Sequence, residues 1–105
     1  MEQPNLKYID ELAGSDKGFK RSIILILKKE LAKETESYKT LMASQNYGAT
    51  SELVHKLKHK ISVLGLDKSY YIAENFESGL KKNDVALQAD FERILGIMHK
   101  FVCDL

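Results

Sequence analysis

The sequence predicts an all-α protein, an antiparallel four-helix bundle with a short additional helix at the N-terminus. Three observations support this fold class. Apolar residues recur every three to four positions along most of the chain, which places them on one face of a helix. No segment alternates between apolar and polar residues as a half-buried strand would. The breaks between the periodic segments are short, and the single proline, Pro4, precedes them all.

Asn5, Leu6, Ile9 and Leu12 predict the short first helix. The three apolar residues lie at helical spacing, and Asn5 can cap the helix from the preceding position. Gly14 then ends it.

A long second helix follows, with Ser15 or Asp16 as its cap. Ile24 and Ile26 widen its apolar stripe, so we expect part of this helix to be covered on more than one side. The residues expected to face the core are Phe19, Ile23, Leu27, Leu31, Tyr38 and Leu41.

The third helix is predicted between two polar or flexible breaks. Asn46 is its expected N-cap, with Thr50 as the alternative, and Gly65 can end it in a left-handed conformation. Its apolar stripe consists of Leu53, Val54, Leu57, Ile61 and Leu64.

Two further helices complete the chain. Asp67 can cap the fourth helix, and Asn83 with Asp84 marks the last turn and caps the fifth. Gly96 inside the fifth helix costs about 1 kcal/mol relative to alanine, so we interpret it as the mark of a close helix contact. The expected buried residues are Ile72, Ala73, Phe76 and Leu80 in the fourth helix, and Leu87, Phe91, Ile94, Met98, Phe101 and Leu105 in the fifth.

Composition limits the size and the location of the protein. With 105 residues, 44% of them hydrophobic and 30% charged, we expect one domain, residues 1–105, around a single core. The longest apolar run, residues 23–27, is too short to span a bilayer, and no signal-peptide pattern follows Met1. The one cysteine, Cys103, permits no internal disulfide. We therefore expect a complete cytoplasmic protein that does not bind a membrane.

The charge balance argues against nucleic acid as a partner. The formal net charge is only +1, so the surface as a whole does not attract polyanions. Tyr70 and Tyr71 beside Lys68 could stack on single-stranded bases, but the broad basic groove that such binding needs is missing. We interpret these tyrosines as half-buried residues at the edge of the bundle.

His55 is the candidate for chemistry. It lies nearly opposite the apolar stripe of its helix, and Lys58, His59 and Ser62 share this outward side. An exposed neutral imidazole is a competent nucleophile, and an ammonium one turn away can neutralise a phosphoryl group bound to it. We therefore predict that His55 accepts a phosphoryl group and that Lys58 stabilises it.

At these residues the chain resembles the histidine-containing phosphotransfer (HPt) domains. Their signature is His-x-Leu-Lys-Gly followed, after a short apolar run, by a second glycine. His55, Leu57 and Lys58 match this signature, and Gly65 matches the later glycine. His59 stands where the first glycine is usual, in a position that the family keeps open to a docking partner. The order of the predicted helices also agrees with the family over most of the chain.

The resemblance implies the partners and one further site residue. HPt domains relay a phosphoryl group between aspartates of response-regulator receiver domains in a multistep phosphorelay that begins at a hybrid histidine kinase. By this resemblance Glu77, on the following helix, is a candidate hydrogen-bond partner for the inner nitrogen of His55. We expect a monomer that binds no cofactor, with Mg²⁺ held by the receiver domain, and no autonomous kinase or phosphatase activity.

Two other functional classes stay open. The bundle could be a non-catalytic protein-interaction module in which His55 has no chemical role. It could also bind metal, because His55 with His59 and His99 with Cys103 are two pairs at i, i+4 spacing. A four-ligand site would require their two helices to face each other through those sides.

Overall fold

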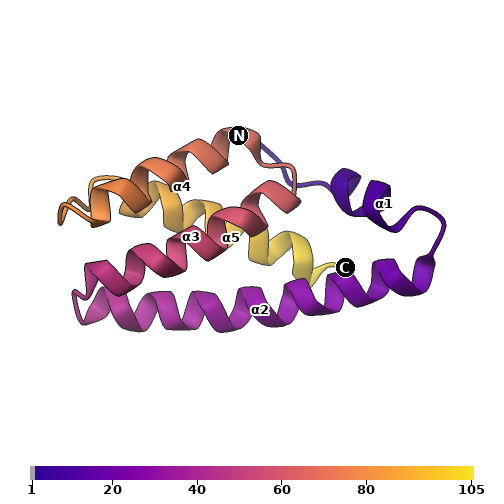
Figure 1. The fold of residues 1–105 in the computed structure, drawn as a ribbon, viewed down its shortest axis with the longest axis horizontal. Helices are drawn as coiled ribbons and strands as arrows, with labels where there is room; N and C mark the ends of the chain where they lie inside the picture. The colour runs from indigo at the N-terminus through magenta and orange to yellow at the C-terminus, as the bar shows by residue number, and fades with distance from the viewer. Residues whose placement is uncertain (1) are drawn as a thin grey trace.

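The computed structural model describes residues 2–105, and within this range the regular secondary structure consists of five helices without a strand (Figure 1). The predicted all-α class is confirmed. The helices are α1 (Lys7–Ala13), α2 (Lys17–Ala43), α3 (Tyr47–Val63), α4 (Asp67–Leu80) and α5 (Gln88–Cys103).

The predicted boundaries of the second and third helices are confirmed by their caps. The side chain of Asp16 accepts a hydrogen bond from the amide of Phe19, and Asn46 accepts one from Ala49. Gly65 has a φ of +75°, the left-handed conformation expected of it after α3.

The predicted cap of α4 is wrong. Asp67 is the first residue of this helix, and no side chain at the N-cap position, Leu66, bonds the free amides. The carboxylate of Glu2 instead accepts hydrogen bonds from the amides of Lys68 and Ser69, both at 2.9 Å. The hydrogen-bond acceptor for the first amides of α4 therefore comes from the N-terminal segment, which is distant in sequence, and not from the residues next to the helix.

The predicted start of the fifth helix is also wrong. Asn83 and Asp84 do form a turn, and Asn83 has a φ of +60°. Asp84 accepts a hydrogen bond from the amide of Ala86, which continues the turn, and α5 begins only at Gln88. Asx residues favour both turns and caps, and the turn is what forms here.

Helices α2, α3, α4 and α5 share one hydrophobic core, to which α1 contributes Ile9. Each of the successive pairs α2–α3, α3–α4 and α4–α5 packs together, and α5 also packs on α2. Tyr38, Phe76 and Phe91, from three different helices, form an aromatic cluster with ring centres 5.0–6.4 Å apart. Edge-to-face and tilted contacts of this kind add to the stabilisation from apolar burial.

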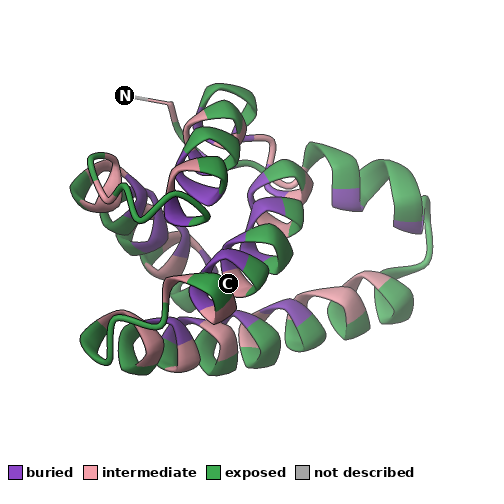
Figure 2. Cartoon of the chain, turned by 60° about the vertical axis from the view of Figure 1, so that its left-hand side comes forward, coloured by how far each residue is buried: buried purple, intermediate pink, exposed green. Residues whose placement is uncertain are grey.

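The N-terminal turns of α2 extend beyond this core (Figure 1), and its buried residues begin only at Leu27 (Figure 2). Phe19 and Ile26 are exposed, so the expectations that Phe19 faces the core and that Ile26 is covered are wrong. The apolar residues recur at helical spacing here, but they are only partly covered, by α1 and by Leu105 at the end of the chain. No helix within residues 2–105 is long and apolar enough to cross a membrane.

Two expectations for the fifth helix are wrong as well. A Cβ atom at Gly96 would meet nothing within 4 Å, so this glycine marks no close helix contact. Leu105 lies beyond the end of α5 and is exposed.

Candidate functional site

His55 lies on the solvent-facing side of α3, as its position opposite the apolar stripe predicts. Its side chain is 52% exposed. The Nδ1 atom lies 3.1 Å from Oε2 of Glu77 on α4, which is the hydrogen bond expected of Glu77. Because a carboxylate can only accept, Nδ1 carries the proton and donates, and in the neutral ring the lone pair therefore lies on Nε2.

Glu77 is the centre of the site rather than a solvated helix residue. It is only 8% exposed, and α3 and α4 pack closely around it. Besides His55, it contacts Lys58 Nζ at 3.0 Å and Lys81 Nζ at 3.7 Å. A buried carboxylate needs such partners, because removing it from water without them is costly.

Lys58 does not lie on the outward side of α3 with His55, and this part of the prediction is wrong. It is buried, its ammonium is paired with Glu77, and it lies 5.4 Å from the centre of the Tyr70 ring. Position 58 follows Leu57 and is one turn before Ile61, so it borders the apolar stripe on the side covered by α4. The aliphatic part of the Lys58 side chain therefore packs between α3 and α4, while its ammonium group pairs with the carboxylate of Glu77.

The ion pair shifts the pKa of both partners toward the charged forms. Burial would raise the pKa of Glu77, but hydrogen bonds from Lys58 and His55 outweigh it, so the pKa of this carboxyl is lowered. Burial would lower the pKa of Lys58, but the hydrogen bond and the charge of Glu77 outweigh it, so the pKa of this ammonium is raised. Both groups are therefore charged at neutral pH.

His59 and Ser62 are exposed on the same side of α3 as His55, in agreement with the sequence prediction. The ring centres of His55 and His59 are 4.9 Å apart. Gly65 is not part of this surface. It follows the end of α3 and lies beside Asn5. The backbone N–H of Asn5 donates a 2.8 Å hydrogen bond to the Leu64 carbonyl. A Cβ atom at Gly65 would lie 2.5 Å from the side chain of Asn5.

A shallow hollow beside His55 brings in two further cations, Lys56 and Lys81. Its lining residues are Ser51, Glu52, His55, Lys56, Glu77 and Lys81. The side chain of Lys81 is 63% exposed. The sequence indicates that Lys81 lies beside Glu77, because residues at i, i+4 spacing are neighbours on the surface of a helix.

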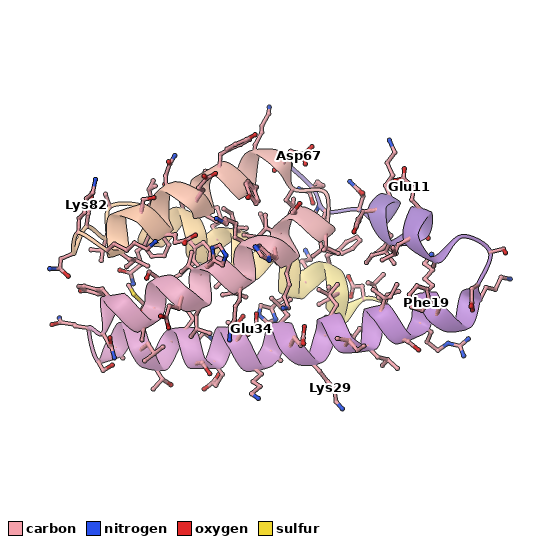
Figure 3. All side chains as sticks on the ribbon, in the orientation of Figure 1. Glu11, Phe19, Lys29, Glu34, Asp67 and Lys82 are labelled. Carbon is pink, nitrogen blue, oxygen red and sulfur yellow. The ribbon has the colours of Figure 1, made fainter. Side chains whose placement is uncertain are left out.

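Lys60, also on α3, is directed elsewhere. It forms ion pairs with Glu30 and Glu34, both on α2. Glu34 is labelled in Figure 3, where α2 and α3 lie side by side. The charge of Lys60 therefore serves the contact between α2 and α3.

The four-ligand metal site considered from the sequence does not form. His99 is hydrogen-bonded through Nε2 to Thr35 Oγ1 at 2.9 Å, and Cys103 is exposed near the end of α5. No group of three or more histidine, cysteine, aspartate or glutamate side chains arranged to hold a metal ion is found within residues 2–105.

Comparison with protein-family models, with curated proteins and with solved structures gives no match for this chain. A functional assignment therefore depends on the geometry of the site and on the sequence motif.

Proposed function

We propose that this protein is a histidine phosphocarrier, in which His55 relays a phosphoryl group between aspartates of receiver domains in a multistep phosphorelay. The observation that carries the proposal is the state of the imidazole. Nδ1 is hydrogen-bonded to a buried carboxylate, while the ring is half exposed, so that in the neutral ring the lone pair lies on Nε2. This is the arrangement that a nucleophilic imidazole requires.

In the proposed reaction, Nε2 attacks the phosphorus of an aspartyl phosphate on one receiver domain. The N–P bond forms as the P–O bond to the aspartate breaks, and the aspartate carboxylate leaves with the electron pair. Nδ1 keeps its proton, and Glu77 balances the positive charge that the ring gains. Transfer to the second receiver is the reverse of these steps. Mg²⁺ is supplied by the receiver domains, and ATP is used only by the upstream kinase.

The cations have separate roles in this proposal. Lys58 anchors Glu77 from the interior and adds positive charge beneath the site. Lys81 and Lys56 border the hollow beside His55, so their ammonium groups are the ones that can approach the phosphoryl oxygens. His59 occupies the surface where a receiver domain would dock.

The same proposal extends to the fold and the setting. Helices α2 to α5 would form an antiparallel four-helix bundle, which is supported by the packing of α2 on α3, α3 on α4, α4 on α5 and α5 on α2. Such a carrier would act as a monomer in the cytoplasm and bind its partners through a small, transient interface around His55.

The test is phosphoryl transfer from a phosphorylated receiver domain to the purified protein. Wild type should acquire acid-labile phosphate, and His55→Gln should acquire none. His99→Gln is the matched control, because His99 lies on α5 and is bonded to Thr35, so this variant should label like wild type. Equal labelling of wild type and His55→Gln would refute the proposal.

A protein-interaction module without phosphotransfer is the second candidate, and one observation favours it. Phe19, Leu25 and Ile26 are exposed on the first half of α2, and exposed apolar side chains close together are typical of contact surfaces. If no receiver domain labels wild type, this candidate is the better one.

A further inference from the structure

We propose that His55 and His59 chelate a zinc ion, and that the bound ion and the phosphoryl group exclude each other at His55. The mutual exclusion rests on the proposed function, whereas zinc binding does not. Both histidines are exposed on one face of α3 at i, i+4 spacing, the arrangement that helical zinc sites use.

The distance between the two rings already suits a shared ion. Two imidazoles bound to one tetrahedral zinc ion through Zn–N bonds of about 2.0–2.1 Å have ring centres roughly 5 Å apart. The ring centres of His55 and His59 are 4.9 Å apart. The separation of the two rings is therefore compatible with a shared ion.

Glu77 prepares His55 as a ligand. Histidine ligands to zinc commonly donate their second ring N–H to a carboxylate, which fixes the ring and makes the coordinating nitrogen more basic. The Nδ1–H of His55 donates to Glu77, with the two atoms 3.1 Å apart. The coordinating atom would therefore be Nε2, the same atom that would accept the phosphoryl group.

Ion pairs and one carboxylate offset part of the positive charge beside the two histidines. The ammonium of Lys58 is buried and paired with Glu77, and that of Lys60 is paired with Glu30 and Glu34 on α2. Glu52, one turn before His55, adds a negative charge to the hollow beside it. Lys56 and Lys81 are the cations that remain near the ion.

The chain supplies two donors to this site, because no group of three or more ligating side chains forms within residues 2–105. Water or a partner's side chain would complete the zinc coordination, so the site is open and exchangeable rather than structural. Removal of zinc should therefore leave the fold intact, unlike removal from a structural zinc site.

The first test is calorimetric titration of the unphosphorylated protein with zinc ions alone. Wild type should bind one zinc ion per chain, and His55→Gln and His59→Gln should each bind at least about tenfold more weakly, a loss of about 1.4 kcal/mol. His99→Gln should bind like wild type. Circular dichroism establishes that every variant is folded. The proposal is overturned if His59→Gln binds zinc as wild type does, or if His99→Gln loses as much affinity.

The second test measures exclusion by comparing the initial rate of labelling with and without zinc, at a fixed excess of Mg²⁺. Zinc should slow labelling of wild type, and the ratio of the two rates should move toward one in His59→Gln. If zinc binds through the two histidines but the wild-type rate does not change, the exclusion is wrong. If nothing labels wild type in the absence of zinc, the proposed function fails while the titration still decides the metal site.

Discussion

At the scale of single residues, the site depends on Glu77, because it joins the exposed imidazole to the interior of the protein. Its carboxylate contacts His55 on the solvent side and Lys58 on the buried side. A neutral residue could orient the ring, but only a charge can hold Lys58 in the interface and balance a positively charged ring at the same time.

Replacing Glu77 should separate orientation of the ring from charge. Glu77→Gln keeps an oxygen that can accept from Nδ1–H, whereas Glu77→Ala removes it. We expect Glu77→Ala to slow labelling of His55 by about 10–100-fold, the usual cost of losing an orienting partner, and Glu77→Gln to slow it less. The rates come from labelling by a phosphorylated receiver domain, and equal rates for all three proteins would show that Glu77 does not orient the ring.

The lowered pKa of Glu77 also predicts a pH dependence of stability. A lowered pKa in the folded state stabilises the fold above the ordinary glutamate pKa, near 4.3, and this contribution is lost as the pH falls through the folded-state value. At pH 7, Glu77→Gln should therefore lower the free energy of unfolding by about 1–3 kcal/mol.

Urea denaturation of wild type and Glu77→Gln at pH 7 and at pH 3 measures this effect. The difference between the two proteins should shrink at the lower pH, because protonated Glu77 also loses its ion pair with Lys58. A difference that stays constant would show that the pair does not contribute through its charge.

At the scale of elements, Gly65 at the end of α3 and Gly96 inside α5 have different roles. Gly65 has a φ of +75° and lies against Asn5, so it ends α3 in a conformation that other residues adopt at a cost. Gly96 lies within α5 with open space around it, so nothing in the described structure requires a glycine there.

Alanine substitutions should therefore change stability in opposite directions. Gly65→Ala should destabilise the protein by about 1–2 kcal/mol, the cost of the left-handed conformation for a residue with a Cβ. Gly96→Ala should stabilise it by about 0.4–1 kcal/mol, because alanine is the better helix former. Chemical denaturation measures both, and destabilisation by Gly96→Ala would contradict the open surroundings seen at this position.

At the scale of the whole molecule, α2 is longer than the core that it packs against. Its buried residues are Leu27, Leu31, Thr35 and Tyr38, all beyond its first two turns. Lys29 points away from the other helices in Figure 3, and the N-terminal turns of α2, where Lys20 pairs with Asp10, lie beside α1. Local stability follows buried apolar contact, so it should be uneven along this helix.

Native-state hydrogen exchange should show this difference. Amides of residues 20–24 should exchange at least about tenfold faster than those of residues 31–38, which corresponds to an opening free energy lower by about 1.4 kcal/mol or more. Uniform protection along α2 would mean that its N-terminal turns are covered by contacts other than those described.

The sequence by itself determined the helical class, the caps to within Ser15 or Asp16 and Asn46 or Thr50, the left-handed end at Gly65 and the exposure of His55. These features depend on helical periodicity and on neighbours within a few residues, which the sequence displays directly. The contact between Glu77 and His55 was expected only through a family resemblance, because spacing within one helix cannot show what the next helix brings.

Only the tertiary structure decided which way Lys58 turns, that Glu2 caps α4, and that the N-terminal turns of α2 extend beyond the core. Each of these depends on how two segments distant in sequence pack together. Lys58 lies at the border between the two faces of α3, and its burial follows from the approach of α4 and the carboxylate that α4 carries. Whether a residue at such a border is buried depends on the helix that packs against it. The apolar period of its own helix does not indicate which residues that second helix brings.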